Sequence, residues 1–192
     1  TAGAAVAARA ASVEAHRAYA ARVGVWVDGF ARLLLGALYP GTPFERSMLA
    51  MKLYDIHLAT WAESGPGEPP RRAAPAVDLL GETAASRLLQ LLLQDLEPVR
   101  VAAFELLCRF PRGALPGLTT AASVAHLVRW ALSHLGSPRA CESDAAAYVL
   151  RLVWQRYVLQ LGWRVALPSS ASADARASVT VSPAAAAAPT EA

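Results

Sequence analysis

The fold is decided by residues 95–111, DLEPVRVAAFELLCRFP, where helix boundaries and hydrophobic spacing agree. Pro98 suits the first turn of a helix, because the N–H that proline lacks would have no intrahelical partner there, and we expect Glu97 to cap the helix. Pro111 then ends it. The apolar residues fall on one stripe at helical spacing: Val99, Ala103, Leu106, Leu107 and Phe110. We therefore predict an amphipathic helix that buries this stripe.

A leucine-rich helix is expected just before it, with Leu88, Leu91 and Leu92 on its buried side. The order of acidic residue, Pro, Val, Arg, Ala and paired Leu resembles the second helix of a HEAT-type repeat. Small Ala residues let neighbouring helices approach, and the Asp or Arg can tie successive turns together.

A looser copy of this pattern occupies residues 41–61, GTPFERSMLAMKLYDIHLATW. Leu49, Leu53 and Ile56 form one apolar stripe, and a second stripe contains Met51, Tyr54 and Leu58. A helix that is apolar on two faces is expected to lie between two neighbours, as in a stacked array. The chain is therefore predicted to be all-α, an armadillo/HEAT-like α-solenoid fragment, with a compact helical bundle as the alternative.

Two further helices are predicted towards the C-terminus. One begins after Thr119 or Thr120, which can cap it, and ends near Gly136. Its apolar stripe contains Val124, Leu127, Val128, Ala131, Leu132 and Leu135. The other is expected to end at Gly162 and to bury Ala147, Leu150, Trp154, Tyr157, Val158 and Leu161, with Arg151 and Gln155 opposite.

Composition divides the chain into four segments. We predict helical repeat segments at 1–62 and 77–165, a Pro/Gly-rich loop at 63–76, and a disordered Ala/Ser/Pro tail at 166–192. The first residues include neither an initiator Met nor a secretory signal, so we expect an internal segment of a longer chain.

Composition also narrows the class of protein. The 192 residues are 55% hydrophobic, yet every apolar run is interrupted before the roughly 18 residues that span a bilayer. The net charge of +3 is weak evidence for nucleic-acid binding. Cys108 and Cys141 are isolated, which argues against a disulfide scaffold or a zinc site. We expect no membrane association and a cytoplasmic location.

Catalytic motifs are not recognised in the sequence. The Gly-containing stretches lack the spacing of a phosphate-binding loop. His126 and His134 are eight residues apart and are interpreted as surface residues, whereas His57 is expected in the core. Cys108 is expected to pack as a small hydrophobe in its helix. We predict a protein that is not an enzyme, with no catalytic, cofactor-binding or metal-binding residues, no cofactor and no small-molecule substrate.

Four basic residues are the candidates for contact with a partner or RNA. Arg71 and Arg72 lie in the proline-rich loop, where two guanidinium groups can be presented to phosphate or carboxylate. A solvated linker is the alternative interpretation. Arg46 and Lys52 are six residues apart, so they are expected to point to different sides of their helix.

Residues 33–58 resemble the thyroid-adenoma-associated protein family, in which an apolar helix ends in a Tyr/Phe-Pro-Gly-Ser/Thr turn. Here the turn is Tyr39-Pro40-Gly41-Thr42, and the later order around residues 95–110 is also similar. The Arg-Arg-Ser-Ala-Gly-Leu-Pro stretch of that family's core domain is absent, which implies that the segment precedes that core.

The resemblance implies a non-catalytic scaffold that supports an FtsJ-type methyltransferase in modifying the ribose 2′-oxygen in a tRNA anticodon loop. The partners would be the methyltransferase and, through the complex, tRNA. S-adenosylmethionine would bind the partner. A general HEAT/armadillo adaptor for protein–protein interaction, without a role in RNA, is the alternative, because a fold does not determine a function.

Overall fold

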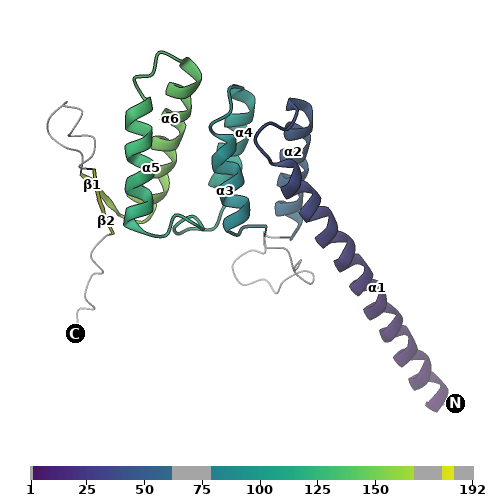
Figure 1. Ribbon diagram of the computed structural model, residues 1–192. Coiled ribbons are helices and arrows are strands. Elements are labelled where there is room, and N and C mark those ends of the chain that lie inside the picture. Colours follow the sequence, from purple (N-terminus) through teal and green to yellow (C-terminus); the bar gives the residue numbers. More distant parts are fainter. Residues whose placement is uncertain (1, 62–78, 167–178, 184–192) are drawn as a thin grey trace, which may run out of the picture.

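The computed structural model describes residues 2–61, 79–166 and 179–183, and these are mostly helical (Figure 1). The described elements, in chain order, are α1 (Ala2–Ala37), α2 (Phe44–Trp61), α3 (Glu82–Leu91), α4 (Glu97–Cys108), α5 (Ala121–His134), α6 (Ala140–Val153), the π-helical turn η1 (Trp154–Gln160), β1 (Arg164–Ala166) and β2 (Thr180–Ser182). In these parts of the chain, no helix is both long and apolar enough to cross a membrane.

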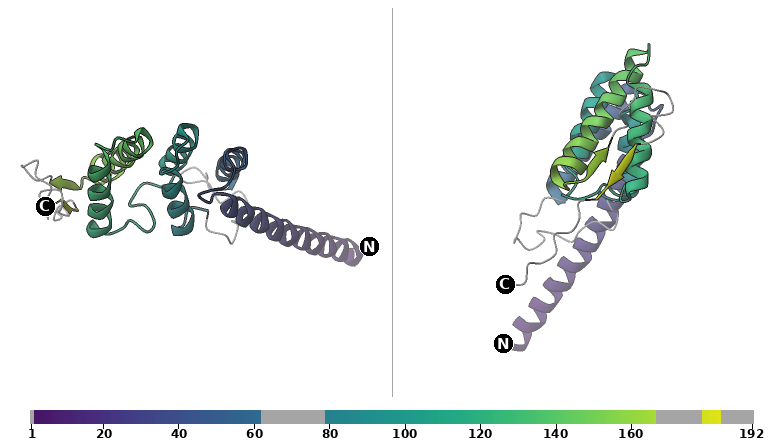
Figure 2. Two further views of the ribbon diagram at one scale, coloured as in Figure 1. Left: turned by 45° about the horizontal axis from the view of Figure 1, so that its top comes forward. Right: turned by 90° about the vertical axis from the view of Figure 1, so that its left-hand side faces the viewer.

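The helices form three pairs, α1–α2, α3–α4 and α5–α6, which stand in a row (Figures 1 and 2). The pairs are joined through their second helices, because α4 packs against both α2 and α6. A hydrogen bond adds to this packing, because the guanidinium of Arg87 in α3 donates to the carbonyl of Leu35 in α1. One hydrophobic core runs from α1 through α4 to α6, and a second joins α5, η1 and the strands.

The helix predicted from residues 95–111 is α4. All five residues of its predicted stripe are buried, and Pro98 lies in the first turn. The prediction that Glu97 caps the helix is wrong. Leu96 is the N-cap, with an extended backbone and no side-chain cap, and Glu97 is the first helical residue. Its carboxylate there faces the positive end of the helix dipole.

The second helix of the first pair, α2, is buried on one side only. Met51, Tyr54 and Leu58 are in the core, but Leu49 is 58% exposed and Ile56 61% exposed. The prediction that this helix lies between two neighbours is confirmed, because α2 packs against both α1 and α4, but the stripe with Leu49 and Ile56 is not buried as expected. The first pair stands at the end of the row, so nothing described covers its outer side (Figure 1).

The prediction for the buried face of the last long helix is confirmed for Tyr157, which is buried, but is wrong for Trp154. Trp154 is 57% exposed, whereas Arg156 is 3% exposed. The difference begins before the π-helical turn at Trp154, because Ala146 and Val149 are already buried while Ala147 is exposed, and Arg156 continues this buried face. Gly162 does follow the helix end, as predicted, with a φ of 69°.

The tail is not irregular throughout. Thr180–Ser182 form β2, which pairs antiparallel with β1 and places Val181 opposite Val165. Val179 and Val181 alternate with polar residues and are buried beside α5, which explains why this stretch is ordered. The rest of the predicted tail and the predicted loop at 63–76 lie outside the described residues.

Candidate protein-binding groove

A groove of about 680 Å³ lies between α2 and α4, the second helices of the first two pairs. Its apolar residues are Met48, Met51, Pro98, Val101, Ala102 and Leu106. Its charged residues are Lys52, Asp55, Glu97, Glu105 and Arg109. This combination of apolar surface and a few charged groups is typical of sites that bind a side chain or a peptide segment.

The exposed stripe of α4 forms one wall of the groove. Glu97, Val101 and Glu105 are four residues apart, so they lie above one another on the same face of the helix. The opposite face of α4 carries the buried stripe that holds the helix in the core. One helix therefore supplies both the contacts that anchor it in the core and one wall of the groove.

An ion pair joins the two walls. Nε of Arg109, just after α4, lies 2.9 Å from Oδ1 of Asp55 in α2, and both side chains are about 40% exposed. A partly exposed pair of this kind contributes only about 0–1 kcal/mol to stability, because solvent screens it. Its geometric effect is to fix the separation of α2 and α4 at one end of the groove.

The charges that remain are mainly acidic. Glu97, Glu105 and Lys52 are exposed and form no ion pair with another residue in the described ranges. Two carboxylates on α4 therefore face one ammonium group on α2 across an apolar floor. Such a rim favours a ligand that carries positive charge beside α4.

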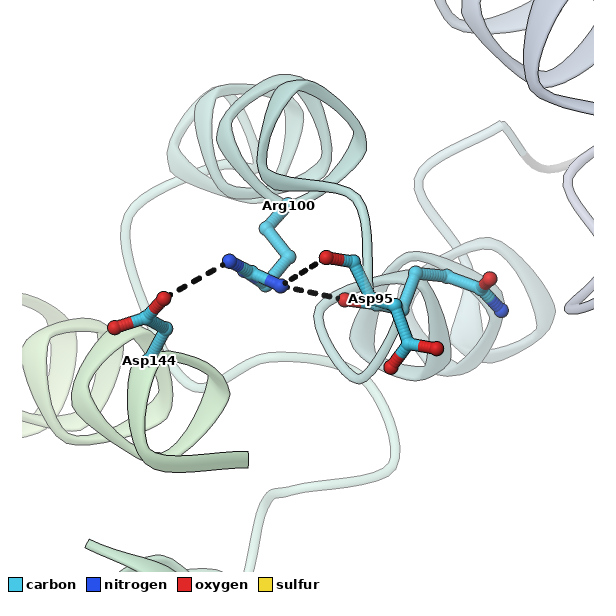
Figure 3. Close-up of polar contacts among 4 residues, drawn as sticks. Asp95, Arg100 and Asp144 are labelled. Carbon is cyan, nitrogen blue, oxygen red and sulfur yellow. Dashed lines mark hydrogen bonds and ion pairs between the residues drawn. The ribbon is translucent and has the colours of Figure 1, made fainter. Parts of the chain in front are cut away.

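Arg100, in the first turn of α4, ties the start of this helix to the residues just before it and to α6 (Figure 3). Its side chain is 3% exposed, and Nη1 donates to the carbonyls of Gln94 at 2.8 Å and Asp95 at 3.0 Å. Nη2 donates to Oδ2 of Asp144 in α6 at 3.1 Å. This confirms the prediction that the Arg of this motif ties successive turns, and it also joins the second pair to the third.

Arg156 holds the opposite end of α4. Its guanidinium comes from η1, and Nη2 donates to the carbonyls of Leu107 and Phe110 at 3.0 and 2.9 Å. Nη1 donates to Pro111 and Gly113 at 2.7 and 3.1 Å. Burial lowers the pKa of Arg156 from its ordinary value, but four carbonyl dipoles at a helix C-terminus stabilise the cation there.

The predicted contact residues are separated in the structure. Lys52 lines the groove, while Arg46 lines a different cavity on the outer side of α2. This confirms that they point to different sides of their helix. Arg71 and Arg72 lie outside the described residues. The groove residues Asp55, Glu97 and Glu105 were missed, because a charged residue on an exposed helix face gives no signal until the neighbouring helix is placed.

The side chains of His57 and Cys108 have surroundings that do not activate them. His57 is buried in the core as predicted, and burial lowers its pKa. Cys108, which was expected to pack as a small hydrophobe in its helix, is exposed, and the partial burial of its thiol raises the thiol pKa. A raised pKa keeps a thiol protonated and unreactive. Within the described ranges, no three His, Cys, Asp or Glu residues are grouped to hold a metal ion.

Comparison with known proteins finds no match. No family model fits the sequence, and neither a curated protein nor a solved structure is similar to the chain at a significant level.

Proposed function

We propose that this chain is a non-catalytic helical-repeat scaffold, of the armadillo/HEAT type, which binds a segment of a partner protein in the groove between α2 and α4. The observation that carries the proposal is the composition of the groove. The groove has an apolar floor and unpaired charges at its rim. Its α4 wall is held at both ends, by the hydrogen bonds of Arg100 and of Arg156. A site held in this way loses little entropy when it binds.

The order of contacts supports the repeat assignment. In an α-solenoid each repeat contacts only its neighbours, and the second helices line one surface. Here α2 contacts α4, and α4 contacts α6, while three helix pairs follow one another in a row (Figure 2). Extended surfaces of this kind bind segments of other proteins.

The charge of the groove favours a protein over RNA. Phosphate groups are bound by clusters of Arg and Lys, and the affinity grows with the number of phosphates neutralised. The groove contributes one free cation, Lys52, against Glu97 and Glu105. An FtsJ-type methyltransferase is thus proposed as a protein partner, on the resemblance of residues 33–58, and tRNA would be contacted elsewhere in such a complex.

The experiment is to pan a random peptide display library on the full chain. We expect enrichment of peptides that place apolar side chains beside Arg or Lys. A chain carrying both Glu97→Arg and Glu105→Arg should lose these peptides and select acidic ones, because the rim is reversed. Glu14→Arg, an exposed change on α1, is the matched control and should select the original peptides. If the doubly substituted chain enriches the same peptides as the wild-type chain, the groove is not the peptide-binding site.

A second measurement separates the two partner classes. A purified FtsJ-type methyltransferase is titrated into the chain by calorimetry, and tRNA ribose methylation is mapped in cells with the double reversal. Binding that the reversal abolishes, with loss of anticodon-loop methylation, supports the methyltransferase partner. Peptide selection without methyltransferase binding leaves the general adaptor and eliminates the role in tRNA modification.

A further inference from the structure

An exposed apolar seam runs along α1. Tyr19, Trp26 and Leu33 are seven residues apart and are 68%, 66% and 66% exposed. Val23 and Phe30 follow Tyr19 and Trp26 by four residues and are half-buried. Alternate spacing of four and three residues is the heptad pattern by which two helices pack along their length. The seam is therefore built for another helix.

The neighbouring helix α2 continues the same surface. Leu49, Leu53 and Ile56 also alternate by four and three residues, and Leu49 and Ile56 are exposed. A cavity of about 470 Å³ is lined by Leu33 of α1 together with Leu49 and Leu53 of α2. The two seams thus lie side by side on the outer side of the first helix pair, away from the α2 face that packs into the core.

Two glycines on α1 favour close approach of a second backbone. Gly29 and Gly36 lie beside the seam within the helix, and a Cβ added at either one would meet nothing within 4 Å. Glycine inside a helix lowers its stability relative to alanine. No contact among the described residues accounts for glycine at these positions, but an approaching helix would.

The size of the surface suits a dimer. Tyr19, Trp26, Leu33, Leu49 and Ile56 together leave about 500 Å² exposed, taking roughly 150 Å² for each side chain. A stable interface buries about 800 Å² on each partner, and the small residues between these side chains extend the patch towards that area. A patch of this size is also at the upper end of what a monomer leaves open to water.

We propose that this surface binds a second copy of the chain, so that two α1–α2 pairs form an antiparallel four-helix bundle. The length of α1 favours a copy over a further stacked pair. Residues 9–22 of α1 are exposed and extend away from the rest of the chain (Figures 1 and 2). A short helix stacked on α2 would leave Tyr19 open, whereas an antiparallel α1 from a second copy covers it.

The register of such a pair can be derived from the seam. If the twofold axis passes between residues 24 and 25, Trp26 of one copy packs on Val23 of the other, and Tyr19 packs on Phe30. The positions that flank the seam between residues 13 and 36 contain one charged residue, Arg22, which then faces Gly29 of the second copy. This register brings no like charges together, and it places the small glycine where the long arginine side chain needs room.

The test is sedimentation equilibrium of the full chain across a concentration series. We expect a mass of twice the 20.2 kDa of the chain, and Leu33→Glu should weaken self-association at least tenfold. Leu159→Glu is the matched control, because Leu159 is 64% exposed on η1 and lies outside the seam, and it should leave association unchanged. Circular dichroism of each variant verifies that the helices are retained.

Two results would overturn the proposal. One is a wild-type chain that stays monomeric at concentrations up to roughly 200 µM. The other is a dimer that Leu33→Glu does not weaken, since that dimer would use another surface. In either case a helical segment of a different protein becomes the occupant to seek.

Discussion

Replacing Arg156 by Met is the perturbation that bears most directly on how α4 is held. The guanidinium is 3% exposed and donates four hydrogen bonds to main-chain carbonyls between Leu107 and Gly113. Methionine has a similar length and no donor, so the substitution preserves most of the packing and removes the bonds. The carbonyls at the end of α4 then lose their partners in a region that water reaches poorly.

The expected loss follows from opposing contributions. Each hydrogen bond to a charged group contributes about 1.5–3 kcal/mol, so four such bonds would suggest a larger loss than is observed for single substitutions. Burial of the guanidinium costs several kcal/mol, and this cost disappears with the charge. We therefore expect the free energy of unfolding to fall by about 3–5 kcal/mol, a large part of the 5–15 kcal/mol that stabilises most domains.

The assay is urea unfolding followed by circular dichroism, with m-values compared between variants. Arg151→Met is the control, because Arg151 is exposed on the preceding turn and only stacks over the Phe104 ring at 4.9 Å, a contact that contributes about 0.5–1 kcal/mol. Arg156→Lys should be intermediate, since an ammonium group cannot reach all four carbonyls. A loss below about 1 kcal/mol for Arg156→Met would refute the view that these bonds hold α4.

Three further outcomes are expected. Tyr157→Phe should lower the free energy of unfolding by about 1–3 kcal/mol in urea titration, because the hydroxyl accepts from the buried N–H of Leu115 at 3.1 Å and donates to Leu118 at 2.8 Å. Stability should decrease as the pH falls below about 6.5, because burial lowers the pKa of His57 and the unfolded chain is protonated first; His57→Leu should flatten this dependence between pH 7 and pH 5. Gly24→Ala should raise the melting temperature through a gain of about 0.5–1 kcal/mol, because its Cβ would enter open space and stiffen α1, and an unchanged or lower value would contradict this.

Local rules were sufficient for α4 and for the start of α5. In α4 a proline lies near each end, which sets the helix boundaries. The apolar stripe lies on one face and leaves a clear polar face opposite, so only one face can be buried. At α5, Thr120 accepts a hydrogen bond from the N–H of Ser123, as its position before an apolar stripe indicates. Both features are determined by residues within one or two helical turns.

The end of α6 was beyond such rules. Residues 147–161 are apolar on several sides, so hydrophobic spacing does not select a single buried face. The choice depends on the C-terminal carbonyls of α4, which lie more than 40 residues earlier in the chain and need donors. Arg156 satisfies them from the same face of the helix as the buried Val149 and Leu152. An arginine in an apolar helix is therefore better interpreted together with the helix ends that lie near it.

The groove was unpredictable for a related reason. Lys52 and Glu105 belong to different helix pairs, and their separation in space depends on the angle at which α4 packs on α2. The sequence indicated the exposed face of each helix but not the distance between those faces. Leu49 and Ile56 illustrate the opposite case. Their apolar stripe predicts that another helix packs on it, but the local pattern does not say which helix that is, and both residues are exposed in the structure.

The two buried arginines also bear on how the groove works. Arg100 joins the start of α4 to α6, and Arg156 joins the end of α4 to η1, which continues α6. Both ends of one groove wall are thus tied to the third helix pair, and the other wall, α2, is tied to α4 by the pair between Asp55 and Arg109. A partner that spreads the groove has to strain these bonds, so the site should accept segments that fit its present width and reject bulkier ones. Arg156→Met then acts at the groove without touching a ligand: peptides selected on it should be less uniform in size than those selected on the wild-type chain.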